Sequence, residues 1–165
     1  MDSSLQPYSY IVHKPFFYSF TTDKGVEYVC YFTPYAEYFK SYPSSISSKF
    51  FAFNLELLDK HARTKGIDKR IAHTVITIVG DFLDAQTNAV VYVCDTSDSK
   101  EAIRAKKFKS WFNYYEFSDQ ILQVDSNFIV GDMKLYTTLL VHRKNKLKKE
   151  LIAAYIELTT TEEGK

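Results

Sequence analysis

The chain has 165 residues, of which 45% are hydrophobic and 25% charged, and this composition excludes a disordered chain and indicates one globular domain. The formal net charge of +1 excludes a strong overall field that would recruit nucleic acid or a membrane surface. The aromatic share of 16% is high. It favours a strand-rich structure, since rings fit a half-buried pleated surface, and an aromatic-lined pocket or interface is the alternative.

The first third of the chain carries runs of aromatic and β-branched residues, which are typical of strands. Three strands are predicted, at residues 8–13, 16–21 and 26–32. Asp23 and Gly25 lie between the second and third runs and predict a hairpin turn, because glycine adopts a positive φ without steric cost. Pro15 lies between the first two runs and predicts an edge or a kink.

The middle of the chain predicts a short helix, a strand, a long helix and a second strand. The short helix falls within residues 34–48 and the first strand at residues 50–58. In the long helix the apolar residues mark one helical stripe, and Asp68 is in position to cap its start. The stripe consists of Ile71, Val75, Ile78 and Phe82. Residues 89–94 are apolar without alternation, which predicts a strand covered on both faces.

The rest of the chain predicts a second helix that Asp98 or Ser99 caps, two paired strands and a closing helix that ends at Leu158. The paired strands are residues 121–130 and 133–142. The strand–helix–strand unit in residues 50–94 predicts two parallel strands, and the hairpins at either end predict antiparallel ones.

The expected fold class is therefore α/β in the α+β sense. The central sheet is expected to be mixed and mostly antiparallel, with helices packed on it, in a single domain over residues 1–158. Residues 159–165 are expected to form a frayed tail.

The loop before the long helix combines basic residues with a glycine. Its sequence is Arg63-Thr64-Lys65-Gly66-Ile67-Asp68. Exposed amides and the positive end of the helix dipole attract an anion at such a place. The alternative is an ordinary solvated helix start that Asp68 caps. The residues themselves leave both interpretations open.

This loop and the order of the surrounding elements resemble the GNAT superfamily of N-acetyltransferases, over roughly residues 50–142. In that superfamily, Gln or Arg, two further residues, Gly, one residue and then Gly or Ala hold the pyrophosphate of acetyl-CoA. The corresponding cofactor-binding residues here are Arg63, Lys65, Gly66, Ile67 and Asp68. The chain departs from the pattern at Asp68, and also before Phe16, where only Lys14 and Pro15 replace the usual two helices. The chain also resembles the small bacterial families of unknown function.

The resemblance implies that an acyl-CoA lies in a split of the sheet and passes its acyl group to a primary amine, with positioning as the main source of rate. Glu56 lies within an apolar strand, and a carboxylate buried there would have a raised pKa and act as general base. A position on the solvent face, or a pair with a lysine, is the alternative. Tyr115 is the candidate proton donor to the leaving thiolate, and a packed aromatic side chain is its alternative.

The remaining chemistry-bearing residues predict no metal site and no membrane span. Cys30 and Cys94 lie in apolar runs and are expected to be free buried thiols, with a disulfide as the alternative. The four histidines lack the spacing of zinc ligands. A signal-peptide pattern and an apolar run of about 18 residues are both missing, so a cytoplasmic protein is expected.

Two basic clusters provide a second hypothesis, which is a binding module without chemistry. Residues 100–109 and 143–149 each hold five Lys or Arg residues, and together they would contact nucleic acid if they adjoin. Solvated helix faces are the alternative. A protein partner would instead contact the aromatic residues between Tyr31 and Tyr42. The sequence leaves open whether the domain is an N-acyltransferase or such a module.

Overall fold

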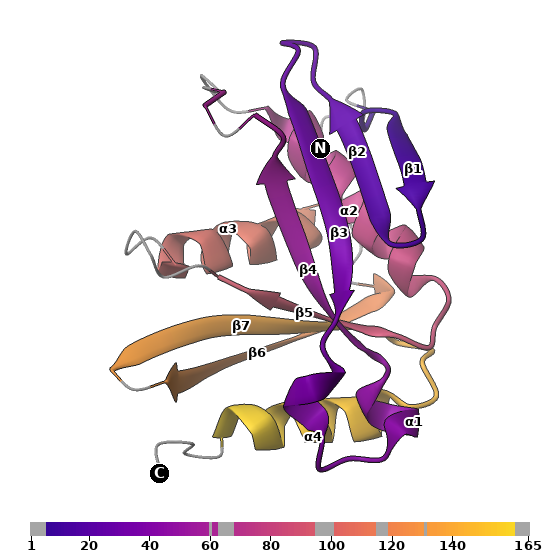
Figure 1. The fold of residues 1–165 in the computed structure, drawn as a ribbon, viewed down its shortest axis with the longest axis vertical. Coiled ribbons are helices and arrows are strands. Elements are labelled where there is room, and N and C mark those ends of the chain that lie inside the picture. Colours follow the sequence, from indigo (N-terminus) through magenta and orange to yellow (C-terminus); the bar gives the residue numbers. More distant parts are fainter. Residues whose placement is uncertain are drawn as a thin grey trace.

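The computed structural model describes residues 6–59, 61–62, 68–94, 101–114, 119–130 and 132–160, and its elements follow the predicted order (Figure 1). The strands are β1 (Tyr10–Lys14), β2 (Phe17–Thr21), β3 (Glu27–Pro34), β4 (Phe50–Leu57), β5 (Ala89–Val93), β6 (Ile121–Val130) and β7 (Met133–His142). The helices are the 3₁₀ turn η1 (Ala36–Phe39), α1 (Ser44–Ser47), α2 (Lys69–Leu83), α3 (Glu101–Tyr114) and α4 (Lys148–Thr160).

The seven strands form one sheet in the order β1-β2-β3-β4-β5-β7-β6. Every neighbouring pair is antiparallel except β4 and β5, which are parallel. The chain passes through α2 between these two strands, because a parallel pair cannot be joined by a tight turn. The predicted fold class is confirmed: a single α+β domain has a mixed, mostly antiparallel sheet with helices packed on it.

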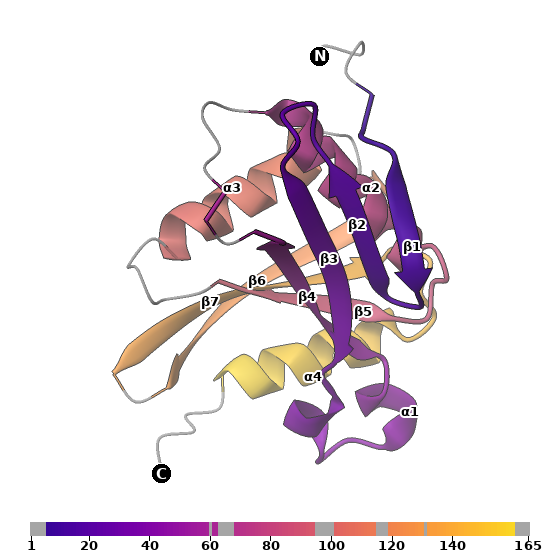
Figure 2. The same cartoon turned by 45° about the horizontal axis from the view of Figure 1, so that its top comes forward.

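Helices cover both faces of the sheet, but not over its whole width. On one face, α2 and α3 bury Val79 and Phe112 in the larger core, together with Phe32 and Leu140 of the sheet. On the opposite face, Tyr155 of α4 belongs to a second core beside η1. In Figures 1 and 2, α4 lies along the β5-β7-β6 half, α1 lies below the lower ends of β3 and β4, and no described helix lies in front of β1 to β4. One face of β1 to β4 is therefore bare of helices in the described part of the chain.

The helix α2 follows directly from its sequence. Asp68 caps it, since its side chain accepts a hydrogen bond from the amide of Arg70 at 2.9 Å. Val75, Ile78 and Phe82 of the predicted stripe are buried. The Phe82 ring stacks on Phe32 of β3 with centroids 3.9 Å apart, so the stripe faces the sheet as its period predicts.

The turn between β1 and β2 confirms that no helix fits there. It consists of Pro15 and Phe16, and Phe16 has a φ of +71°, which side chains other than glycine rarely adopt. Its ring lies 5.2 Å from that of Phe51 and 5.4 Å from that of Phe82, measured between centroids. Ring packing onto the core therefore holds a backbone conformation that the sequence does not predict.

Two element boundaries differ from the prediction. The expected short helix after Pro34 is divided into η1 and α1, and Pro43 directly precedes α1. The closing helix continues to Thr160, and the buried Thr159 hydroxyl donates to the Tyr155 carbonyl at 2.9 Å. These two threonines are therefore part of α4 and not of a tail. Residues 161–165, and the predicted caps at Asp98 and Ser99, lie outside the described residues.

Candidate functional site

The parallel strands β4 and β5 are paired over only part of their length. The ladder joins Phe50 to Ala89, Phe51 to Val90 and Ala52 to Val91. Beyond Ala52, β4 continues beside β3 to Leu57 while β5 continues beside β7, and the two strands fan apart in Figure 1. In the described part of the chain, no strand lies along this end of β4 on the β5 side. A free strand edge presents amide and carbonyl groups to an extended ligand.

The opening between β4 and β5 holds a cavity of about 670 Å³. Four consecutive residues of β4, from Phe53 to Glu56, line it together with Tyr92 and Val93 of β5 and part of α3. Consecutive residues of a strand point to opposite faces of the sheet, so a cavity that touches four in a row runs past the strand edge from face to face. Its volume is in the range of small-molecule sites.

Aromatic rings form the wall of this cavity on the α3 side. The Phe108 ring stacks on Tyr92 with centroids 3.9 Å apart, and it lies 5.9 Å from Phe53. Trp111 lines the cavity one helical turn further along, and the exposed Lys107 places its ammonium 5.8 Å from the Trp111 centroid. The cavity thus combines an apolar wall with one positive charge at its mouth.

Glu56 lines the cavity and is exposed, so of the two interpretations left open by the sequence the structure shows the position on the solvent face and not the buried carboxylate. The reason is the register of β4: Phe51 and Phe53 point to the core of α2 and α3, while Glu56 lies opposite Val29 on the other face. The Tyr31 hydroxyl donates to Oε1 of Glu56 at 3.0 Å. Burial and this hydrogen bond raise the pKa of Tyr31. The role of Glu56 as general base stays a prediction.

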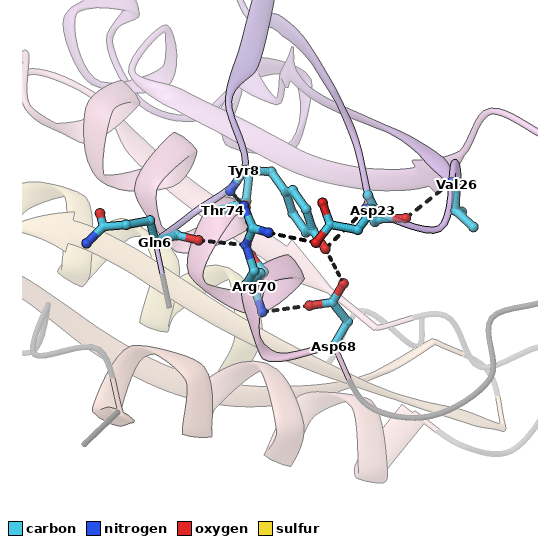
Figure 3. A network of polar contacts seen from close by, with 8 residues as sticks. Gln6, Tyr8, Asp23, Val26, Asp68, Arg70 and Thr74 are labelled. Carbon is cyan, nitrogen blue, oxygen red and sulfur yellow. Dashed lines mark hydrogen bonds and ion pairs between the residues drawn. The ribbon is translucent and has the colours of Figure 1, made fainter. Parts of the chain in front are cut away.

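The start of α2 is tied to the N-terminal segment by a polar network, shown in Figure 3. The Tyr8 hydroxyl donates to Oδ2 of Asp68 at 2.6 Å. The Arg70 guanidinium lies 3.8 Å above the centre of the Tyr8 ring and forms an ion pair with Asp23 at 2.9 Å. The Tyr8 amide also donates to Oγ1 of Thr74 at 2.8 Å. The residues before β1 therefore hold the first turn of α2 against the β2–β3 turn.

Among the described residues, Asp68 already accepts two hydrogen bonds from amides at the start of α2. Its carboxylate accepts from the Arg70 amide, and its carbonyl accepts from the Ile71 amide at 3.2 Å. Any anion that bound these amides would have to displace the cap of the protein itself. The geometry therefore matches the interpretation of Asp68 as a helix cap, and its assignment to a cofactor site stays a prediction.

Several predicted site residues lie outside the described residues. They are Arg63, Lys65, Gly66 and Ile67 of the loop, and the candidate proton donor Tyr115. Within the described residues, Cys30 and Cys94 are buried thiols that form no disulfide, which confirms that prediction. No three His, Cys, Asp or Glu side chains gather there to hold a metal ion. No helix among the described residues is long and apolar enough to cross a membrane.

Lys106, Lys107 and Lys109 of the first basic cluster lie on α3, whereas only Lys148 and Lys149 of the second lie on α4, and these two helices pack on opposite faces of the sheet. α3 contributes Phe108 to the core shared with α2, whereas α4 contributes Leu151 to the core on the other face. Lys109 forms an ion pair with Asp125, and the Lys148 ammonium donates to the Arg143 carbonyl at 2.8 Å. The contact of residues 100–109 and 143–149 with nucleic acid stays a prediction.

Comparison with known proteins places the chain in a family. The model of a family described as "Family of unknown function (DUF6169)" matches residues 67–157, which is more than half of the chain. The chain belongs to this family. The match covers α2 through most of α4 and hence the α3 wall of the cavity, but not β4. The expectation of a family of unknown function is confirmed, and the acetyltransferase resemblance has no support from this match. No curated protein matches the chain.

Of the residues that line the cavity, only Glu56 was a predicted catalytic residue, and those that the prediction missed include Asn54, Tyr92, Lys107 and Trp111. Asn54 is a polar residue inside the apolar run of β4, and that is the same signal that singled out Glu56. Trp111 is the single tryptophan of the chain, on a helix with an otherwise ordinary apolar stripe. Nothing in the sequence distinguishes Lys107 from the other four basic residues of its cluster.

Proposed function

We propose that the domain binds an acyl-CoA with its acyl-pantetheine arm in the cavity between β4 and β5, and that it transfers the acyl group to a primary amine. The single observation that carries the proposal is the parting of the parallel pair after Ala52 around a cavity of about 670 Å³. It supplies the split in the sheet that the resemblance to the acetyltransferases requires.

The chemistry of the cavity suits the arm of an acyl-CoA. This arm is extended and carries amide groups, which pair with a free strand edge as an added strand does. The free end of β4 from Phe53 onward offers such an edge. The rings of Phe108 and Trp111 suit the apolar parts, and the Lys107 ammonium at the mouth attracts the acidic groups of the ligand.

The start of α2 contributes less to ligand binding in this proposal than it does in the acetyltransferases that the chain resembles. Because Asp68 caps the Arg70 amide, the proposal does not depend on a diphosphate at these amides. Lys107 supplies a positive charge from a different element, α3. A ligand held by the cavity and Lys107 therefore stays bound when the cap of α2 remains in place.

The test is a titration of the folded protein with CoA and with acetyl-CoA, followed by calorimetry and by the fluorescence of Trp111. Because Trp111 is the single tryptophan and lines the cavity, its emission reports occupancy directly. Replacing Lys107 by Glu should weaken binding by about tenfold, which corresponds to roughly 1.4 kcal/mol. Lys106→Glu is the matched control, since Lys106 is exposed on the same helix and does not line the cavity.

Two results would contradict the proposal. One is the absence of binding of both ligands to the folded protein. The other is an equal loss of affinity in Lys107→Glu and Lys106→Glu, which would mean that the ligand responds only to the overall charge of α3. Transfer itself is checked by mass spectrometry of an amine after incubation with acetyl-CoA.

A further inference from the structure

The first strand, β1, forms one free edge of the sheet. It stands at the end of the strand order, and in Figure 1 it is the outermost strand beside β2. Among the described residues, no backbone hydrogen bond joins β1 to any segment other than β2. The outward amides and carbonyls of β1 are therefore open to a further strand, and a sheet edge recruits another chain in this way.

The side chains along this edge are apolar and exposed. Ile11 is 63% exposed and Val12 is 57% exposed. Neighbours in a strand point to opposite faces of the sheet, so the edge is apolar on both faces. Phe16, in the turn that follows β1, is 40% exposed, so three of the six exposed large hydrophobic side chains of the described residues lie at this one edge. Apolar side chains gathered in this way mark a surface for association.

The opposite edge of the sheet has a different character. It is formed by β6, on which Asp125 and Asn127 are exposed. Lys109 of α3 forms an ion pair with Asp125. Charges on an edge strand protect it from pairing with another chain. Pairing of β1 with β6 of another copy, which would build an open filament, would press apolar side chains against this ion pair. The contrast between the two edges therefore favours pairing of β1 with β1.

The residues of β1 are complementary to themselves in an antiparallel pair. The register of β1 against β2 is regular from Tyr10 to Val12 and shifts between Val12 and Lys14, so the regular stretch is centred on Ile11. A two-fold axis at Ile11 places Tyr10 opposite Val12 of a second copy, and an aromatic residue opposite a β-branched one stabilises a sheet. The two Lys14 residues then lie about 20 Å apart along the strands, where salt screens their repulsion.

Tyr10 is already fixed in place on the α2 side of the sheet. Its hydroxyl donates to Asp81 of α2, and its ring packs edge to face against Tyr18 with centroids 6.0 Å apart. A side chain that is held before association loses little conformational entropy when a partner arrives. Val12 of a second copy would therefore pack against a ring whose position is set in the single chain.

We propose that two copies of this chain associate through β1, in an antiparallel pair centred on Ile11, so that their two seven-stranded sheets join into one. A short strand pair buries less surface than a standard interface, so this dimer is weak and its population depends on protein concentration. The dimer is independent of the proposed acyl transfer, because no residue of β1 lines the cavity.

The first experiment is sedimentation velocity of the whole protein over a range of concentrations. The wild type should convert from monomer to dimer between about 1 and about 300 μM. Ile11→Lys places two like charges directly opposite each other and should raise the dissociation constant of the dimer by at least about tenfold. Leu58→Lys is the matched control, because it adds the same charge at a side chain of similar exposure, 60%, beyond the end of β4. It should leave the dissociation constant unchanged.

Disulfide cross-linking tests the register. Residues directly opposite each other in an antiparallel pair have Cα atoms about 4.5–5.5 Å apart, within the range of a disulfide. Ile11→Cys should therefore form a covalent dimer under mild oxidation. Lys14→Cys, about 20 Å from its copy, should not. The native Cys30 and Cys94 are buried and do not compete for this reaction.

The outcomes decide the inference. A dimer that only Ile11→Lys weakens, together with cross-linking of Ile11→Cys, supports pairing through β1. A protein that stays monomeric at the highest concentration overturns it. Equal weakening by Ile11→Lys and Leu58→Lys also overturns it, since the dimer would then respond only to total charge. Equal cross-linking of Ile11→Cys and Lys14→Cys has the same meaning, because random collision would explain it.

Discussion

Replacing Asp68 by Ala removes two contacts of different kinds at the start of α2. The carboxylate accepts from the Arg70 amide at 2.9 Å and from the Tyr8 hydroxyl at 2.6 Å. Loss of the cap costs about 1 kcal/mol. Loss of the partly buried bond from Tyr8 adds about 1 kcal/mol. The free energy of unfolding should therefore fall by about 2 kcal/mol, which lowers the Tm by roughly 4–8 °C for a domain of this size.

Three further single variants and one double variant divide this total. Asp68→Asn keeps a good capping side chain and should cost only about 0.5 kcal/mol. Tyr8→Phe leaves the cap and should cost about 1 kcal/mol. Asp23→Asn breaks the ion pair with Arg70, but the Asp23 side chain is 79% exposed, so the loss should stay below about 0.5 kcal/mol. Tyr8 and Asp68 changed together should lose less than the sum of the single changes, because they share one hydrogen bond.

Chemical denaturation of the wild type and the five variants at neutral pH measures these differences. Equal stability of Asp68→Ala and Asp68→Asn would refute the reasoning, since it would mean that the cap contributes nothing. Strict additivity of Tyr8→Phe and Asp68→Ala would refute the hydrogen bond in Figure 3. The same variants also bear on the site: acyl-CoA affinity should change little in Asp68→Asn if the ligand does not use the amides of this turn.

Three other predictions concern the backbone, the tyrosines and the thiols. Gly25→Ala should cost about 1 kcal/mol in denaturation experiments purely through its φ of +76°, because no atom lies within 4 Å of the added methyl group. Burial raises the pKa of Tyr35 and of Tyr155 to about 12. The stability that these two neutral side chains contribute is therefore complete below the ordinary tyrosine pKa near 10 and is lost as the pH rises through about 12. Tyrosinate absorbance and the free energy of unfolding, measured over the same pH range, should show this loss. Burial also raises the pKa of Cys30 to about 12, and Cys94 is only 1% exposed, so a thiol reagent at mildly alkaline pH should label neither cysteine until the protein unfolds.

The sequence alone predicted those features of the fold that depend on residues close together in the chain. The strands 121–130 and 133–142 were predicted with the bounds that the structure shows, because each run is long and a turn separates them. Asp68 was predicted as the cap of α2, since capping depends on residues within one turn. The mixed sheet followed from the order of elements, because a strand, a helix and a strand in succession favour a parallel pair.

Only the tertiary structure decided which groups meet at the candidate site. Whether Glu56 is buried depends on the register of β4 against β3, and a shift by one residue would reverse every side chain of that strand. The cavity exists because the pairing between β4 and β5 stops at Ala52. No residue type next to Ala52 predicts that the pairing ends there. The aromatic wall of the cavity joins Phe53 of β4 to Phe108 of α3, which lie far apart in the sequence. Periodicity fixes which residues share a face of one element, whereas the neighbours across that face come from chain segments that the local pattern does not contain.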